Sequence, residues 1–161
     1  CVGSGAVSAP FTATEDSDCA IVIGARPTTN HPVAATYIKQ AAKKGTKVII
    51  MDPRKNDMSR HAWEHLEFKP GMDVAMLNAL IYTIIEEELY DKQYVQSMTN
   101  GFEDLKKSIE GFSPEDMSKK CGIDASTLRK VARVYANSEK SIIFGEWVFR
   151  SMYTEQTMLD V

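Results

Sequence analysis

A glycine-containing loop that follows an apolar stretch contains the first residues that could bind a charged ligand. Residues 20–23 are apolar, include β-branched side chains and are ended by Gly24. Pro32 suits the first turn of a helix, because its φ is fixed and its missing N–H is not needed there. A strand, a glycine turn and a helix start place free N–H groups at the carboxyl edge of a sheet. The sequence therefore predicts an anion site in this loop, suited to a phosphate.

Two aspartates follow the next predicted elements. Asp52 comes directly after the apolar run 47–51, where nucleotide-binding folds hold a ribose hydroxyl. Asp73 follows a Lys-Pro-Gly-Met turn and is expected at or near the N-cap of a helix. No Gly-x-Gly-x-x-Gly pattern follows the first apolar run, which disfavours NAD as the ligand.

Each of these features also has a purely structural interpretation. Gly24 could only end a strand, and residues 30–32 could only cap a helix. Asp52 could be a turn residue stabilised by Arg54, and Asp73 could be a plain N-cap. All four features fall at the carboxyl edge of one predicted sheet or at the helix start beside it, where ligands of open α/β sheets bind. This shared placement favours the ligand-binding interpretation.

The elements that must position these residues alternate in type. Short strands with a helix between them form a βαβ unit, which requires parallel strands. Strands are predicted over 19–24, 47–51, 64–68 and 141–144, the last of them buried, and helices over 32–44, 73–89, 92–98, 102–110, 114–120 and 125–138, with helical turns in 8–14 and 56–62. The predicted fold class is α/β, a three-layer Rossmann-like parallel sheet with helices on both faces.

The chain is expected to be a single α/β domain over 1–161. Its parts are a nucleotide-binding half at 19–72, a helical region at 73–138, and a returning strand with a partial helix at 141–161. Both ends look abrupt, so we expect a fragment of a larger enzyme.

Composition narrows the functional class. Hydrophobic residues make up 43% and charged residues 25% of the 161, as in soluble globular proteins. The net charge of −3 does not favour a nucleic-acid partner. No apolar run approaches the roughly 20 residues of a membrane-spanning helix, and no signal peptide is visible. Three widely spaced cysteines favour a reducing compartment, so we expect a cytoplasmic protein, with a periplasmic parent enzyme as the alternative.

No catalytic residue and no metal ligand is predicted. His61 and His65 have the spacing of a metal pair on a helix, but the strand-like run 64–68 argues against a continuous helix there. Cys1 is not assigned as a ligand, and Cys19 and Cys121 are expected to be buried apolar residues.

The order and spacing of several motifs resemble the molybdopterin oxidoreductases, most closely the catalytic (alpha) subunits of formate dehydrogenases. The likeness covers roughly residues 2–144. Its motifs are residues 19–35, Asp52-Pro-Arg54, Phe68-Lys-Pro-Gly-Met-Asp73, Asn78-Ala-Leu, Glu86-Glu-Glu-Leu-Tyr-Asp91, Gly101-Phe-Glu, Phe112-Ser-Pro-Glu, Gly122-Ile-Asp and Ala132-Arg-Val-Tyr-Ala136.

This resemblance implies a cofactor and a reaction. The cofactor would be bis-molybdopterin guanine dinucleotide carrying molybdenum or tungsten, and a 4Fe-4S cluster would be bound outside this chain. The reaction would be two-electron oxidation of formate to carbon dioxide, with the isolated fragment inactive. The remaining domains of the parent chain and electron-transfer subunits or carriers would be its partners.

The resemblance also implies which residues bind the cofactor. The loop would line the pyrophosphate and pterin, and the residues at the second strand end would address the guanosine ribose. Asp73 would accept hydrogen bonds from the ring N–H and amine of guanine, two donors that lie side by side. The implied residues are Gly24, Ala25, Arg26, Pro27, Thr28, Thr29, Asn30, His31, Asp52, Pro53, Arg54, Gly71 and Asp73.

Two departures from the family pattern limit this assignment. Arg26 stands where many relatives have Asn, so the loop would bind phosphate through a charge. Residues 145–161 match poorly and receive no role. The alternatives that stay open are another α/β enzyme that binds NAD or a mononucleotide, a non-catalytic nucleotide-binding module, or a related molybdopterin enzyme such as a nitrate reductase.

Overall fold

The computed structural model describes residues 9–145, and the chain divides into two compact units. Unit 1 consists of residues 1–65 and 139–161, and unit 2 consists of residues 66–138. Cys1 and the partial helix expected after the last strand lie outside the described residues.

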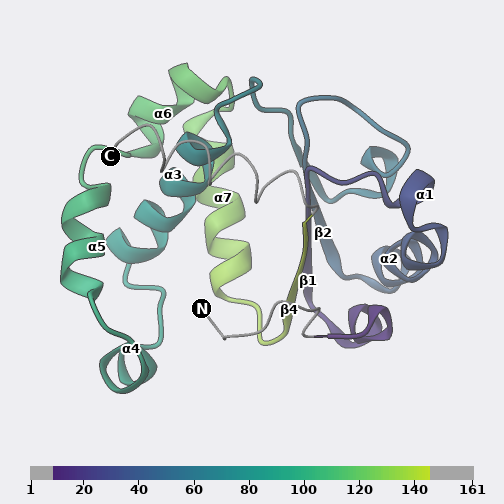
Figure 1. Cartoon of the computed structure of the whole chain (residues 1–161), viewed down its shortest axis with the longest axis horizontal. Helices are drawn as coiled ribbons and strands as arrows, with labels where there is room; N and C mark the ends of the chain where they lie inside the picture. The colour runs from purple at the N-terminus through teal and green to yellow at the C-terminus, as the bar shows by residue number, and fades with distance from the viewer. Residues whose placement is uncertain (1–8, 146–161) are drawn as a thin grey trace, which may run out of the picture. The chain divides into compact units, whose positions relative to one another are not determined.

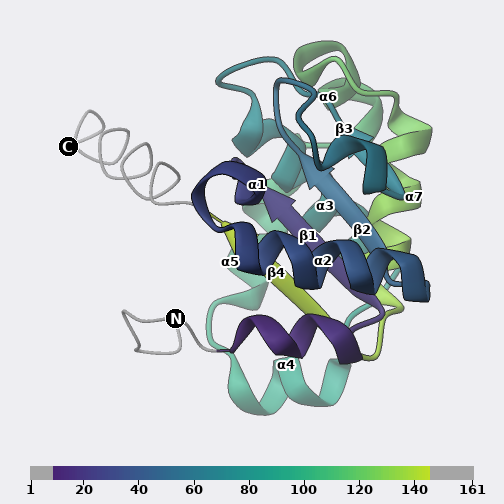
Figure 2. The same ribbon diagram turned by 90° about the vertical axis from the view of Figure 1, so that its right-hand side faces the viewer.

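A four-stranded sheet forms the centre of unit 1. Its strand order is β3-β2-β1-β4, and β1 pairs in parallel with both β2 and β4 (Figure 2). The strands are β1 (Cys19–Ile23), β2 (Lys47–Met51), β3 (Glu64–Leu66) and β4 (Ser141–Gly145). The predicted α/β class with a parallel sheet is confirmed.

The strands differ in burial according to their position in the sheet. All five residues of β1 are buried, as expected for an inner strand covered on both faces. The prediction of a buried strand over 141–144 is wrong, because β4 alternates between partly buried and exposed residues, and Ile143 is 55% exposed. The reason is topological: among the described residues β4 lies at the edge of the sheet, with β1 on one side only.

Helices of unit 1 complete the βαβ unit. They are η1 (Phe11–Asp16), α1 (Pro27–Asn30), α2 (Pro32–Lys44) and η2 (Ser59–His61), the η elements being 3-10 helices. Ala35 and Ile38 of α2 pack with Ala20, Val22, Val48, Ile50 and Met58 in one apolar cluster. Gly45 ends α2 with a φ of 111°, a left-handed conformation that glycine adopts without strain. Helix α2 and the turn that joins it to β2 therefore agree with the prediction.

Unit 2 is helical, and α3 packs against α5, α6 and α7 (Figure 1). Its helices are α3 (Asp73–Glu86), α4 (Lys92–Met98), α5 (Phe102–Ile109), α6 (Pro114–Cys121) and α7 (Ala125–Ala136). Helix α3 ends three residues earlier than predicted, and Glu88 adopts a positive φ of 53° soon afterwards. Ser113 caps α6 by accepting a hydrogen bond from the Asp116 N–H, whereas the Asp124 side chain makes no capping bond to α7.

Candidate functional site

The ends of β1 and β2 meet at the carboxyl edge of the sheet in unit 1. Ile23 and Met51 are partners in the parallel register, and the Gly24 N–H donates to the Met51 carbonyl at 3.0 Å. Gly24 is exposed and has a φ of 59°, a conformation that strains other residues. The structure therefore brings Gly24 and Asp52 together at this edge, as the sequence predicts.

The loop after Gly24 contains one more helical turn than expected. Pro27 is the first residue of α1, where its fixed φ favours a helix start, and its side chain is buried. The Thr29 and Asn30 N–H groups donate to the Arg26 carbonyl at 2.9 and 3.0 Å. Arg26, Thr29 and Asn30 are exposed, so this turn presents polar side chains to solvent.

His31 links the loop to α2 without capping it. It occupies the N-cap position of α2, but its imidazole makes no capping hydrogen bond. Its ring lies 6.3 Å from the ring of Phe11, which in turn lies 6.2 Å from the ring of Phe144. The expectation that Asn30 or His31 occupies the cap position is therefore confirmed for His31, although its exposed ring contacts another aromatic ring instead of capping the helix.

Asp52 stabilises its own turn. The residue is only 8% exposed, and its carboxylate Oδ1 accepts the Arg54 N–H at 2.8 Å. The Asn56 side-chain amide donates to Oδ2 over a longer 3.5 Å. Aspartate often closes a turn in this way, by accepting from the backbone two residues further on. A carboxylate accepts about four hydrogen bonds, so Asp52 keeps capacity for a ligand hydroxyl.

Asp73 in unit 2 lacks hydrogen bonds of the kind that Asp52 accepts from its own turn. It is the first residue of α3 and only 7% exposed. Asp73 lies directly after the N-cap residue Met72, so its predicted place at or near the N-cap is confirmed, but among the described residues no hydrogen bond reaches its carboxylate. Within residues 9–145, the only buried side-chain nitrogen or oxygen without a hydrogen-bond partner is Nε2 of His65, so the Asp73 oxygens reach solvent. The Asp73 carboxylate can therefore accept hydrogen bonds from donors of a ligand.

Gly71 shapes the turn that leads to Asp73. It is exposed and has a φ of 79°. The Met72 N–H donates to the Lys69 carbonyl at 3.0 Å and closes the turn. The turn thus delivers the chain to the first residue of α3.

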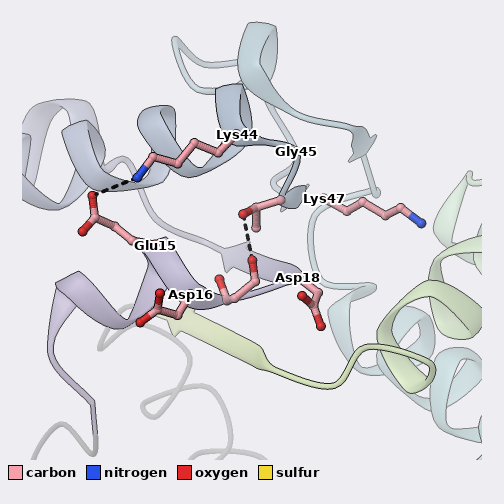
Figure 3. A pocket seen from close by; sticks show the side chains of 8 residues that line it. Glu15, Asp16, Asp18, Lys44, Gly45 and Lys47 are labelled. Carbon is pink, nitrogen blue, oxygen red and sulfur yellow. Dashed lines mark hydrogen bonds and ion pairs between the residues drawn. The ribbon is translucent and has the colours of Figure 1, made fainter.

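A hollow of about 420 Å³ lies at the other end of the strands of unit 1 (Figure 3). Lys44 pairs with Glu15 at 3.5 Å, and the Thr46 hydroxyl donates to the Ser17 carbonyl at 2.8 Å. The hollow is lined by Glu15, Asp16, Ser17, Asp18, Lys44, Gly45, Thr46 and Lys47. None of these is a predicted ligand residue, so this hollow is separate from the edge that carries Gly24 and Asp52.

Within residues 9–145, no group of three His, Cys, Asp or Glu side chains could hold a metal ion. His61 lies in η2 and His65 in β3, so no continuous helix carries both, as predicted. Burial first, and then the neighbouring Arg60, lowers the pKa of His61. Cys19 and Cys121 are buried, as predicted, and burial raises the pKa of the Cys19 thiol to about 11.

An ion-pair network in unit 2 was not expected from the sequence. Arg129 forms a bidentate pair with Glu115, at 2.9 and 3.0 Å, and donates to Glu86 at 2.7 Å. Arg133 donates to both oxygens of Glu87, at 2.7 and 2.9 Å. The acidic run at the end of α3 is therefore paired by α7, which offsets its unfavourable position at a helix C-terminus. The regular spacing of the two arginines on one helix face was the signal for it.

These contacts shift the pKa values of the network. A hydrogen bond from Arg133 is the main cause that lowers the pKa of Glu87. A hydrogen bond from Arg129 likewise lowers the pKa of Glu115, and the same contacts raise the pKa of Arg129. The network contains no free acid or base, so it serves to join helices.

The sequence matches the Molybdopterin oxidoreductase family over residues 2–159. Because the match covers nearly the whole chain, this chain belongs to that family. Membership implies a molybdopterin cofactor, and the predicted family resemblance is confirmed.

Curated relatives narrow the class. The chain is 40% identical over 142 residues to "Formate dehydrogenase H" of Escherichia coli, covering 88% of this chain and 20% of that protein. It is 38% identical over 143 residues to "F420-dependent formate dehydrogenase subunit alpha" of Methanocaldococcus jannaschii, covering 89% of this chain and 21% of that protein. The chain therefore spans about a fifth of the length of the curated relatives that it matches.

A solved structure confirms the fold. Acetylene hydratase from Pelobacter acetylenicus superposes with a TM-score of 0.74 at 28% identity, covering 83% of this chain and 20% of that chain. The residues of this chain fit the implied cofactor. The exposed glycine turn of unit 1 and its polar side chains suit a phosphate, and the Asp73 carboxylate of unit 2, which has no hydrogen-bond partner among the described residues, suits a group with N–H donors.

Proposed function

We propose that this chain binds the guanine dinucleotide form of the molybdopterin cofactor in a formate-oxidising enzyme. The observation that carries the proposal is the state of Asp73, a residue that is 7% exposed and whose carboxylate accepts no hydrogen bond within residues 9–145. Guanine presents a ring N–H and an exocyclic amine on one edge, and a carboxylate accepts both at once. Adenine offers no such adjacent pair of donors.

Unit 1 carries residues that suit the phosphate and ribose parts of such a cofactor. Gly24 leaves the backbone open at the strand end, and Arg26 and Arg54 are exposed cations that suit phosphate oxygens. Asp52 holds its turn and keeps acceptor capacity for a ribose hydroxyl. The other residues of this proposed contact set are Ala25, Pro27, Thr28, Thr29, Asn30, His31, Pro53 and Gly71.

The chain's own task would be to bind and orient the cofactor. Molybdenum or tungsten on the pterin supplies the two-electron chemistry when the cofactor is bound. We assign no catalytic residue and no metal ligand to this chain, and the 4Fe-4S cluster would be bound outside it. Each binding residue contributes by fixing where the cofactor lies, since small errors in position are costly in catalysis.

The partners and the cellular location are part of the same proposal. The names of two relatives include "subunit alpha", which supports association with electron-transfer subunits or carriers. We place the protein in the cytoplasm because of its few, widely spaced cysteines. Among the described residues, no helix has the length and apolar character needed to cross a membrane.

The nucleotide part of the proposal is tested by what the purified protein carries. Acid hydrolysis of the cofactor should release GMP, because the dinucleotide joins GMP to the pterin phosphate through a pyrophosphate. Competition between GDP, ADP and NAD for the cofactor-stripped protein should favour GDP. Equal binding of the three, or tighter binding of NAD, would instead support another α/β nucleotide-binding enzyme.

The substrate part of the proposal needs a separate measurement. Formate-dependent dye reduction by the intact parent enzyme, loaded with cofactor, should exceed its nitrate-dependent dye oxidation. A related molybdopterin enzyme such as a nitrate reductase is the second candidate, and activity with nitrate alone would establish it. Either result leaves the guanine assignment of Asp73 intact, since it depends on the cofactor and not on the substrate.

A further inference from the structure

The turn that carries Gly71 and leads to Asp73 is attached to the end of α6. The Lys69 N–H donates to the Cys121 carbonyl at 2.9 Å, and the Lys69 ammonium donates to the Lys119 carbonyl at 3.3 Å. Both acceptors belong to the last turn of α6, whose carbonyl groups have no partner within their own helix. The positive charge of Lys69 also suits the negative end of the α6 dipole.

The aliphatic part of Lys69 fits against a glycine. Gly122 follows α6 with a φ of 82°, and a Cβ placed there would lie 3.2 Å from Cε of Lys69 and 3.5 Å from its Cγ. Because glycine has no side chain, the lysine stem can lie over this position. The backbone N–H, the stem and the ammonium of Lys69 thus contact the end of α6 at three points.

This attachment matters because the turn over residues 69–72 leads directly into Asp73, the first residue of α3. The Asp73 carboxylate has no hydrogen-bond partner among the described residues, so the backbone on either side of it determines where it points. Pro70, Gly71 and Met72 are all exposed, so the turn has little packing of its own. The Met76 N–H donates to the Met72 carbonyl and connects the end of the turn to α3, and Lys69 connects its start to α6.

We propose that Lys69 is a positioning residue for guanine recognition: by bonding to the end of α6 it holds the 69–73 turn so that Asp73 meets both guanine donors. The inference rests on the proposed function of Asp73. It assigns Lys69 no contact with the ligand. Losing the Lys69 ammonium should therefore weaken the paired hydrogen bonds between guanine and Asp73 more than it weakens the overall binding of the nucleotide.

The test compares GDP with IDP on the cofactor-stripped full chain. Hypoxanthine lacks the exocyclic amine of guanine, so the ratio of the two dissociation constants reports the second hydrogen bond to Asp73. Lys69→Met keeps the stem and removes the ammonium, and it should lower the preference for GDP about threefold, the worth of one exposed hydrogen bond. Lys69→Arg, which can still donate to the Lys119 carbonyl, should restore the preference.

A matched control lies on the same helix. Lys119→Met removes an exposed ammonium of equal charge but leaves the Lys119 carbonyl in place, so its GDP to IDP ratio should equal that of the wild type. Amide hydrogen exchange gives a readout without ligand: the Lys69 and Met72 amides should exchange faster in Lys69→Met and at the wild-type rate in Lys119→Met.

The outcomes separate this inference from the proposed function. If Lys69→Met keeps both the wild-type ratio and the wild-type exchange rates, the positioning role is wrong, whatever Asp73 does. If the wild type itself does not distinguish GDP from IDP, the guanine assignment fails, and the positioning role for guanine fails with it. A lowered preference for GDP over IDP in both Lys69→Met and Lys119→Met would show a general effect of charge and would also overturn the inference.

Discussion

Two candidate ligand residues, Asp52 in unit 1 and Asp73 in unit 2, are similarly buried but differ in their hydrogen bonds. Asp52 is 8% exposed and accepts from Arg54 and Asn56 of its own turn, whereas Asp73 is 7% exposed and has no partner within residues 9–145. Asp52 is therefore built into the protein before any ligand arrives. The Asp73 carboxylate can accept from a ligand with two adjacent donors. Asp52 should therefore matter more for stability, and Asp73 more for binding.

The largest expected effect is that of Asp73→Asn on guanine binding. The amide keeps the shape of the side chain but replaces one acceptor with a donor that faces a guanine donor. We expect GDP to bind about 30-fold more weakly, the worth of a hydrogen bond to a charged group. The free energy of unfolding without ligand should change by less than about 1 kcal/mol, because no internal bond is lost. Calorimetric titration and urea unfolding measure the two quantities.

The second prediction concerns Asp52. Asp52→Ala removes the acceptor of the Arg54 N–H and should lower the free energy of unfolding by about 1 kcal/mol. Asp52→Asn is the matched control, because its side-chain carbonyl can still accept that N–H, and it should lie closer to the wild type. If Asp52→Ala left stability unchanged while Asp73→Asn lowered it, the contrast between the two aspartates would be refuted.

The third prediction addresses what holds unit 2 in shape around Asp73. Arg129→Met should lower the free energy of unfolding by about 1 kcal/mol, a value kept small because the ion pairs lie near the surface. The discrimination between GDP and IDP should persist, since Arg129 contacts glutamates and not the 69–73 turn. If a fully folded Arg129→Met protein lost that discrimination, the ion-pair network would orient Asp73 as well.

The smallest expected effect is a dependence of stability on acidic pH. Arg133 lowers the pKa of Glu87 in the folded state, so the folded protein binds that proton less readily than the unfolded chain does. The stabilisation from this pair is therefore present above the unfolded pKa of about 4.5 and is lost as the pH falls through the lower folded value. Urea unfolding between pH 3 and 7 should show this loss in the wild type and less of it in Arg133→Met.

The sequence predicted the elements that local rules determine. The strands predicted over 19–24 and 47–51 and the helices predicted over 32–44 and 114–120 each carry a hydrophobic pattern or a start or stop signal, and all four agree with the structure to within one residue. The exposure of β4 could not be predicted, because an edge strand and an inner strand can have the same apolar sequence and differ only in the number of neighbours.

The residues of the candidate site could be predicted from the sequence, but the hydrogen bonds of their side chains could not. That Gly24 and Asp52 share one sheet edge follows from parallel strands joined by a helix. That Asp52 uses its carboxylate in its own turn, while Asp73 does not, depends on backbone details over two or three residues, which no periodicity reports. The network of Arg129 and Arg133 was missed because its partners are more than ten residues distant in the chain.

The most direct test of the account is a crystal structure of the protein with its own cofactor or with GDP bound. The account predicts both oxygens of Asp73 within about 3 Å of the guanine ring nitrogen and of its exocyclic amine. It also predicts that the Asp52 turn keeps its bond to Arg54. A guanine bound elsewhere, with the Asp73 carboxylate still lacking a donor, would contradict the central claim.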